Sequence, residues 1–326
     1  MKKTARKILV IRFSSIGDIV LTTPVVRCLH QQLGAEIHYL TKRAYLPLVE
    51  ANPYIHKVFT IEKKVSEVLP LMKKEGYDHI VDLHKNLRSW QVRLGLRAKT
   101  LSFDKLNFEK WLLVRFKINR LPDRHLVERY LAAVAPLGVH NDGRGLDYFL
   151  PDRPPAVAPS DPPYIAFAIG ATYATKRLPE HKIIEICRSL SLPVVLLGGR
   201  AEAAAGDRIA AAAGPHVHNR CGQIDLHGSA AIIRSAEKVI THDTGMMHIA
   251  AAFQKNILSI WGSTIPGFGM YPYFGTHGTG TNHSFEVTGL PCRPCSKLGH
   301  DKCPKGHFRC MNEMDGGEVG GQFKSE

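Results

Sequence analysis

The sequence places polar side chains directly after several runs of apolar, strand-forming residues. The first run, residues 7–13, leads into SSIGD and then into the helical apolar spacing of residues 19–33. A carboxylate there, Asp18, could take a proton from a reacting hydroxyl, or it could simply cap the helix. The loop has one glycine and not the Gly-x-Gly-x-x-Gly turn that binds dinucleotides, which disfavours an NAD enzyme.

Two loops further along the chain offer groups suited to a nucleoside diphosphate. The predicted strand 164–169 is followed by GATYATKRLP, where Thr172 and Lys176 could bind phosphate at a helix N-terminus. The alternative is a solvated loop with two chance cations. The predicted strand 194–197 is followed by GGRAE, whose Glu202 could accept hydrogen bonds from a ribose.

A third loop, HDTGMMH after the predicted strand 239–241, adds a carboxylate and free backbone donors. Asp243 could accept hydrogen bonds from sugar hydroxyls, and the N–H groups of Thr244 and Gly245 could meet a phosphate. His248 lies one turn into the next helix, where a histidine is often only packed. An aspartic protease would need two such loops in an all-β frame, and this chain has one in alternating strand–helix order.

Strands and helices alternate along the whole chain, which predicts an α/β fold with parallel sheets. Residues 151–163 contain six prolines and are predicted to be a stiff linker. The predicted domains are therefore residues 1–150 and 164–326, two Rossmann-like units facing each other across a cleft. The glycine-rich tail from residue 315 is expected to be loosely ordered. We expect strands at the following residues: 7–13, 36–40, 57–61, 78–83, 164–169, 194–197, 217–219, 239–241 and 257–261.

The positive charge is concentrated in the first half. The 326 residues carry a net charge of +14, and residues 1–150 hold 26 Lys or Arg against 14 Asp or Glu. Such a half favours an anionic partner: nucleic acid, a phosphorylated substrate or a membrane surface. No apolar run reaches 18 residues, and the N-terminus does not match a signal peptide, so we expect a cytosolic protein that does not span a bilayer.

Seven cysteines fall into two groups. Three occur singly, as reduced packed thiols do, which agrees with a cytosolic location. The other four are close in sequence, with His300 and His307 between them. Their spacing is compatible with a structural zinc site of four cysteines or of three cysteines and one histidine, although it is not that of a standard zinc ribbon. A cysteine-containing loop without metal is the alternative. The four clustered residues are Cys292, Cys295, Cys303 and Cys310.

Six motifs together resemble glycosyltransferase family 9, the ADP-heptose:lipopolysaccharide heptosyltransferases, and heptosyltransferase II-like members in particular. They occur in the expected order within residues 7–311. The resemblance implies a GT-B fold and an inverting transfer of heptose from ADP-heptose to the inner core of lipopolysaccharide. The motifs are SSIGDIVLTTPVVRCL, DLHKNLRS, HLVERYL, GATYATKRLPE, LLGGRAE and THDTGMMHIAAA.

The resemblance also implies roles for single residues. Asp18 corresponds to the proposed general base, and Glu202 to the carboxylate that binds ribose. Ala171 stands where some members carry a second threonine, so one phosphate contact is absent. No paired-carboxylate motif lies in the donor loops, and no cofactor is expected for catalysis. The remaining residues implied in donor binding are Thr172, Lys176, Asp243, Thr244, Gly245 and His248.

The acceptor implied by the resemblance is the anionic lipid A–core glycolipid of the inner leaflet. The protein would then be cytoplasmic and peripheral on the inner face of the inner membrane, with no nucleic-acid partner. Four basic residues of the first half are the expected contacts, although each alone could equally belong to a solvated helix face. They are Lys85, Arg88, Arg120 and Arg124.

Two other functions remain open at this point. The same residues could serve a GT-B enzyme with another nucleotide sugar or acceptor. The net charge and the cysteine cluster could also belong to a basic nucleic-acid-binding protein. Against that alternative, the basic half has no helix-turn-helix or aromatic-basic RNA-binding motif, and the cysteines lie in the nearly neutral half.

Overall fold

The computed structural model describes residues 6–151 and 163–322. Contacts between Cα atoms group the chain into two compact units. The first unit holds the residues up to 105 together with 124–151 and 275–278, and the second holds 106–123 and most of the remainder. The predicted linker, 151–163, lies almost wholly outside the described residues, so the predicted domain limits stay a prediction.

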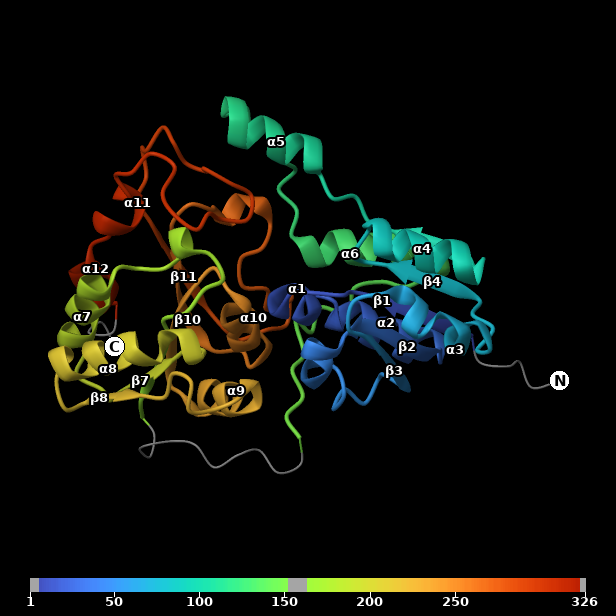
Figure 1. Ribbon diagram of the computed structural model, residues 1–326, viewed down its shortest axis with the longest axis horizontal. Coiled ribbons are helices and arrows are strands. Elements are labelled where there is room, and N and C mark those ends of the chain that lie inside the picture. Colours follow the sequence, from blue (N-terminus) through green and yellow to red (C-terminus); the bar gives the residue numbers. More distant parts are fainter. Residues whose placement is uncertain (1–5, 152–162, 323–326) are drawn as a thin grey trace. The chain divides into compact units, whose positions relative to one another are not determined.

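The first unit contains a five-stranded parallel sheet in the order β3-β2-β1-β4-β5 (Figure 1). Its central strand, KILVI, is a nearly continuous apolar run because helices pack on the sheet. Leu9 and Ile11 of the central strand are fully buried. The strands are β1 (Lys7–Ile11), β2 (Glu36–Lys42), β3 (Lys57–Ile61), β4 (His79–Asp82) and β5 (Lys99–Ser102), and the helices are α1 (Ile16–Val20), α2 (Thr23–Leu33), α3 (Leu69–Lys73), α4 (Leu87–Leu96) and α6 (Leu126–Val134).

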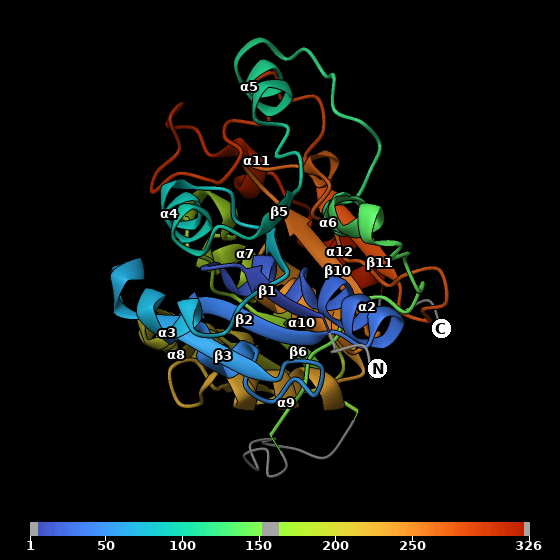
Figure 2. The ribbon, with the colours of Figure 1, turned by 90° about the vertical axis from the view of Figure 1, so that its right-hand side faces the viewer.

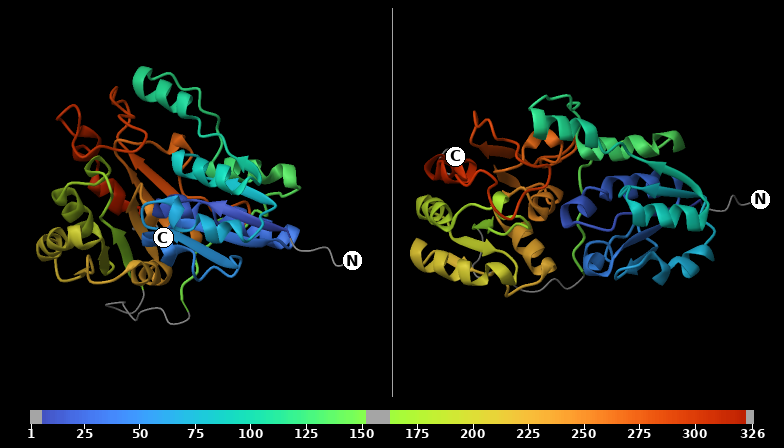
Figure 3. Two further views of the ribbon diagram at one scale, coloured as in Figure 1. Left: turned by 45° about the vertical axis from the view of Figure 1, so that its right-hand side comes forward. Right: turned by 45° about the horizontal axis from the view of Figure 1, so that its top comes forward.

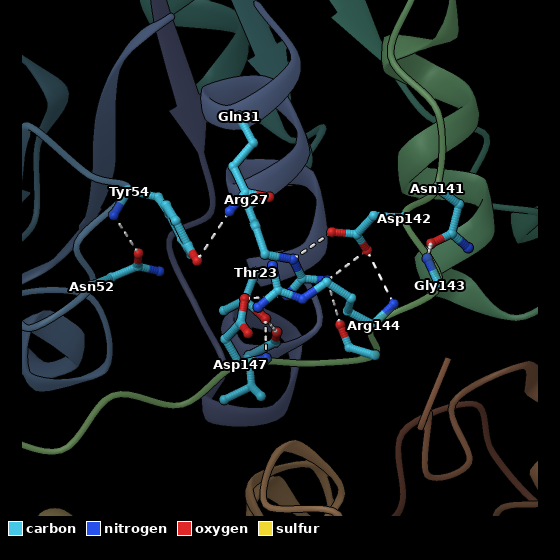
Figure 4. Close-up of polar contacts among 12 residues, drawn as sticks. Thr23, Arg27, Gln31, Asn52, Tyr54, Asn141, Asp142, Gly143, Arg144 and Asp147 are labelled. Carbon is cyan, nitrogen blue, oxygen red and sulfur yellow. Dashed lines mark hydrogen bonds and ion pairs between the residues drawn. The ribbon is translucent and has the colours of Figure 1, made fainter. Parts of the chain in front are cut away.

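A buried arginine fixes the end of the first unit to α2 (Figure 4). Arg27 is fully buried, and its Nε and Nη2 donate to the two carboxylate oxygens of Asp142 at 2.7 and 2.8 Å. Its Nη1 is paired with Asp147, and Nη2 also donates to the carbonyl of Gly145. A buried guanidinium needs such partners on every side. The segment that leaves the first unit is therefore tied to the helix beside the first loop.

The second unit contains a six-stranded parallel sheet in the order β11-β10-β9-β6-β7-β8, which Figure 3 shows with its helices. Apolar runs such as IAFA and VVLL form its fully buried strands. The strands are β6 (Ile165–Ala168), β7 (Val194–Leu197), β8 (Val217–Asn219), β9 (Lys238–His242), β10 (Asn256–Trp261) and β11 (Asn282–Glu286), and the helices are α5 (Asn107–Phe116), α7 (Glu180–Ser189), α8 (Ala203–Ala213), α9 (Leu226–Ser235), α10 (Gly245–Ala252), α11 (Arg309–Asn312) and α12 (Gly316–Gly321).

All nine predicted strands are present, and the predicted α/β architecture with two parallel sheets is confirmed. Two strands were not predicted, β5 and β11, and both lie at a sheet edge. Their sequences, KTLS and NHSFE, are short and polar, which is usual for an edge strand and removes the apolar signal.

The prediction of a loosely ordered tail was wrong for the residues that the structure describes. Residues 316–321 form α12, which packs on α7 and buries Val319 completely. A Cβ atom on Gly316 would lie 2.7 Å from a carboxylate oxygen of Glu185, so the glycine permits a close helix approach. Within the described part of the chain, no helix is long and apolar enough to cross a bilayer.

Candidate active site

Asp18 lies in the first turn of α1, directly after β1. Its Oδ2 accepts hydrogen bonds from the backbone N–H of Ser15 at 3.2 Å and from the Ser15 hydroxyl at 2.7 Å. Its Oδ1 lies 2.6 Å from Nη2 of Arg12. The side chain keeps 20% of its surface exposed. Asp18 therefore does help to cap the helix, and it also presents a partly open carboxylate.

The surroundings of Asp18 keep its carboxylate ionised. Burial alone would raise the pKa of Asp18, but the charge of Arg12 and the hydrogen bonds from Ser15 outweigh burial and lower it below its usual value. Burial and the same guanidinium lower the pKa of His84 to about 4. At neutral pH the site thus holds an anionic Asp18, a cationic Arg12 and a neutral His84.

Arg12 and His84 are residues that the sequence did not single out. Arg12 is buried and donates from Nη1 to the carbonyl of Leu83 at 2.5 Å and to the Tyr130 hydroxyl at 2.9 Å. Arg12 follows β1, and His84 follows the adjacent strand β4. A charged residue immediately after the apolar run KILVI was the one available signal for Arg12.

The four predicted acceptor contacts do not all belong to one unit. Arg88 lies in the first turn of α4, Lys85 two residues before that helix and Arg124 two residues before α6, all in the first unit. Arg120 belongs to the second unit. All four side chains are exposed, and the ammonium of Lys85 donates to the carbonyl of Phe103 at 3.1 Å.

The predicted donor-binding residues gather at one edge of the second sheet. Thr172 and Lys176 follow β6, Glu202 follows β7, and the loop beginning at Asp243 follows β9. These three strands are neighbours in the order β9-β6-β7. Because parallel strands all end at the same edge, the loops that carry these groups adjoin one another.

An ion pair joins the first of these loops to the third. Nζ of Lys176 lies 2.6 Å from Oδ2 of Asp243 and donates to the Asp243 carbonyl at 3.3 Å. The Thr264 hydroxyl donates to the same Oδ2 at 2.7 Å. Asp243 directly precedes Thr244, the residue that caps the start of α10. A cation therefore lies beside a helix N-terminus, where anions bind well.

Glu202 is held by its own loop and by a neighbouring cation. Its Oε2 accepts the N–H of Gly199 at 2.9 Å, and its Oε1 lies 3.2 Å from Nη1 of Arg177. A Cβ atom on Gly170 would lie 3.1 Å from this carboxyl group, so the glycine keeps the approach open. Arg177, the second cation of the loop GATYATKRLP, neutralises the charge of Glu202 in the structure.

The two histidines around the third loop are buried. His248, predicted to contact the donor, is 1% exposed within α10. His242, at the end of β9, accepts the N–H of Leu178 through Nε2 at 3.1 Å. Burial lowers the pKa of His242 to about 3, so it is neutral and supports the loop after β6.

The cysteine-rich segment packs against the loop that carries Lys176. The Thr175 hydroxyl accepts the N–H of His300 at 2.8 Å and donates to the His300 carbonyl at 3.1 Å. The Ser263 hydroxyl donates to the Thr175 hydroxyl oxygen at 2.9 Å, and the Ser263 carbonyl accepts the N–H of Cys295. Thr175 is buried, so these bonds fix the backbone next to Lys176.

The four clustered cysteines are free thiols, and they are only partly gathered. Sγ of Cys292 lies 3.8 Å from Nε2 of His307, close to the roughly 3.6 Å expected between sulfur and nitrogen ligands of a tetrahedral zinc ion. Burial, with a smaller contribution from nearby Cys292, raises the pKa of Cys295 and of Cys310 to about 11.

Metal-ligand atoms that are mutually within 4.8 Å occur in one group of three among residues 6–151 and 163–322, namely Glu36, His38 and Glu75. The ammonium of Lys7 lies 3.2 Å from Glu36 and 2.9 Å from Glu75, and Lys57 lies 2.5 Å from Glu75. The carboxylates are thus neutralised by lysines, and this group is an ion-pair network.

Comparison with known proteins indicates the family of the chain. Residues 69–297 match the model of glycosyltransferase family 9 (heptosyltransferase). Lipopolysaccharide heptosyltransferase 1 of Pseudomonas aeruginosa is 26% identical over 89% of this chain and 86% of its own length, and lipopolysaccharide heptosyltransferase 2 of Escherichia coli is 24% identical over 80% and 84%.

The fold is also that of a solved relative. An Escherichia coli heptosyltransferase determined with ADP superposes with a TM-score of 0.65 at 19% identity, over 90% of this chain and 96% of its own. The expected GT-B fold, with one parallel sheet in each Rossmann-like unit, is confirmed. With the family model covering more than two thirds of its residues, the chain belongs to glycosyltransferase family 9, the heptosyltransferases.

Proposed function

We propose that this glycosyltransferase transfers heptose from ADP-heptose to the inner core of lipopolysaccharide. The observation that carries the proposal is the convergence of Lys176, Glu202 and Asp243 on adjacent loops at one edge of the second sheet. In doubly wound sheets, this edge is where nucleotides bind. The named relatives, which are lipopolysaccharide heptosyltransferases, support heptose as the sugar and the core as the acceptor.

In this proposal the second unit holds the donor diphosphate. Lys176 exchanges part of its pairing with Asp243 for the phosphates, and the Thr172 hydroxyl and the N–H groups of Thr244 and Gly245 add hydrogen bonds. Charge that develops on the leaving ADP is stabilised by the same groups. Glu202 accepts the ribose hydroxyls, and buried His248 supports the helix behind the loop.

Asp18 is the proposed general base of an inverting reaction. As the acceptor hydroxyl attacks the anomeric carbon, its proton passes to the Asp18 carboxylate while the bond to ADP breaks on the opposite face. The lowered pKa of Asp18 keeps it ionised and ready near pH 7. It also makes Asp18 a weak base, so most of the proton transfer accompanies departure of ADP.

The basic residues of the first half are the proposed acceptor contacts. Lys85, Arg88, Arg120 and Arg124 are exposed cations suited to the phosphate and carboxylate groups of the lipid A–core. An acceptor of this kind is embedded in a bilayer, so we place the enzyme in the cytoplasm, on the inner face of the inner membrane.

We further propose that catalysis needs no metal, whereas the cysteine segment binds a structural zinc ion. The donor loops contain lysine and backbone donors in place of paired carboxylates. In the segment, Cys292 and His307 already have the separation of two zinc ligands, and Cys295, Cys303 and Cys310 are the further candidates. Elemental analysis should find about one zinc per chain, and less in Cys292→Ser; absence of zinc from both proteins would refute the site.

Calorimetric titration of the EDTA-treated protein with ADP, UDP and NAD tests the donor assignment. Selective binding of ADP is the expected result. Selective binding of UDP would retain the fold and Asp18 but would discard ADP-heptose. Failure to bind any of the three, together with salt-sensitive binding to duplex DNA, would favour a nucleic-acid-binding protein instead.

A further inference from the structure

One face of helix α5 packs on the rest of the second unit. Leu113 is buried, the ammonium of Lys110 lies 5.9 Å from the ring centre of Phe268, and Nζ of Lys117 donates to the carbonyls of Cys292 and Pro294 at 3.1 and 2.8 Å. Positions 110, 113 and 117 recur on one side of a helix. These contacts fix which side of α5 points away from the unit.

The opposite face of α5 is apolar and exposed. Phe108 and Trp111 are 62% and 51% exposed and stack at 5.9 Å, and Phe116, 54% exposed, meets Trp111 edge-on at 5.2 Å. Arg115 projects from the same face as Phe108 and Trp111, since residues i, i+3 and i+7 align. Figure 2 shows α5 (Asn107–Phe116) joined on both sides by extended segments.

A second helix has the same character. In α4, Leu87, Trp90 and Leu94 share one face and are 72%, 51% and 54% exposed. Nine large hydrophobic side chains are notably exposed in the described part of the chain, and seven lie in α4 or in residues 106–118. Exposed apolar surface concentrated in this way marks an interaction site.

The charge around these faces indicates the partner. Residues 85–124 contain eleven Lys or Arg and three Asp or Glu. Two copies of so basic a segment would repel each other, which argues against self-association through these faces. Aromatic rings combined with an excess of basic over acidic residues are suited to the boundary between anionic headgroups and acyl chains.

We propose that the exposed face of α5 docks on an anionic lipid bilayer, with Phe108 and Trp111 inserted at headgroup depth and Arg115 on the lipid phosphates. This inference rests on the proposed function for its biological setting, because a membrane-embedded acceptor would then be presented next to the enzyme. The docking itself requires no turnover and can be measured separately.

Sedimentation with phosphatidylglycerol–phosphatidylcholine vesicles tests the proposal. The wild-type chain should bind these vesicles, lose binding at high salt and bind pure phosphatidylcholine weakly. Phe108→Ser/Trp111→Ser should reduce the bound fraction at least about tenfold, since both anchors are lost. The control Leu71→Ser/Leu298→Ser removes two equally exposed leucines elsewhere and should bind like the wild type.

A fluorescence measurement reports insertion directly. In Trp90→Phe the remaining tryptophans are Trp111 and Trp261, and Trp261 is buried. Vesicles with brominated acyl chains should quench Trp111 in this variant. Unquenched emission, equal binding of the Phe108→Ser/Trp111→Ser variant, or a dimer that this double substitution dissociates would each overturn bilayer docking.

Activity distinguishes this inference from the proposed function. Phe108→Ser/Trp111→Ser should keep its kcat/KM for a delipidated, water-soluble core acceptor and lose activity on the same acceptor in vesicles. Loss on both acceptors would place these rings in the reaction site and contradict the docking role. A chain that binds vesicles but transfers no heptose would refute the proposed function and leave the docking surface standing.

Discussion

Nη2 of Arg12 lies 2.6 Å from Oδ1 of Asp18, so the proposed base shares its carboxylate with a buried cation. The pairing keeps Asp18 ionised across the physiological pH range, because it outweighs the effect of burial on the pKa. Arg12 is itself held by Leu83 and Tyr130. The position of the Asp18 carboxylate is thereby fixed by a buried side chain that is itself held in place.

Asp18→Asn should lower kcat by about 10² to 10⁴, because the amide fills the same space but cannot accept the proton. The dissociation constant for ADP should change less than about twofold, since the proposed donor site lies in the other unit. Kinetics and calorimetry on the same preparation measure both quantities. Asp78→Asn, at the amino end of β4, is the matched control and should keep normal kcat. A normal kcat in Asp18→Asn would remove Asp18 from this role.

Lys176→Ala should weaken ADP binding by about tenfold or more, the usual cost of one charge-assisted hydrogen bond to phosphate. Lys182→Ala is its control, because Lys182 pairs with Glu185 on α7 and has no proposed contact with the donor. Calorimetric titration of both variants gives the comparison. Equal affinities in the two variants would place the diphosphate away from Lys176.

Arg27→Met should destabilise the protein by about 3 to 5 kcal/mol, because Asp142 and Asp147 lose the cation between them. Urea unfolding followed by circular dichroism measures the change. Arg208→Met breaks an exposed pair with Glu180 and serves as the control, with an unchanged midpoint expected. If both variants unfold at the wild-type midpoint, the buried network does not hold the unit together.

Burial of His242 should lower the free energy of unfolding in acid. Burial lowers its folded-state pKa to about 3, whereas the unfolded chain binds a proton near pH 6.5. The contribution of His242 to the free energy of unfolding is therefore fully present above about pH 6.5. It falls by about 1.4 kcal/mol per pH unit as the pH drops toward 3. Between pH 7 and 5 the wild type should lose about 2 kcal/mol more than His242→Gln in denaturant unfolding. Equal losses would show that His242 is protonated in the folded state.

The sequence predicted the strands that are buried on both faces, because short, continuous apolar runs such as KILVI and IAFA are typical of strands covered by helices on both sides. It could not predict the edge strands β5 and β11, whose polar residues resemble loops. It also could not predict α12, because a glycine-rich sequence is typical of a loop. The glycines of α12 instead allow close packing against α7. Those features depend on tertiary contacts.

The candidate site shows the same division. The loops after β6, β7 and β9 were predictable because strand order alone brings them to one edge. The partners Arg12, Arg177 and Thr264 were not, since each reaches its carboxylate across a distance that only the folded chain defines. The packing of His300 on Thr175 likewise joins residues 125 positions apart.

Transfer of the sugar itself tests the central claim most directly. The purified chain would be incubated with ADP-heptose and with a lipid A–core acceptor that lacks the next heptose, and the products would be followed by mass spectrometry and NMR. One ADP should be released per heptose joined, and the anomeric configuration of the donor should be inverted in the product. Transfer from a UDP-sugar in place of ADP-heptose, or retention of configuration, would contradict the central claim.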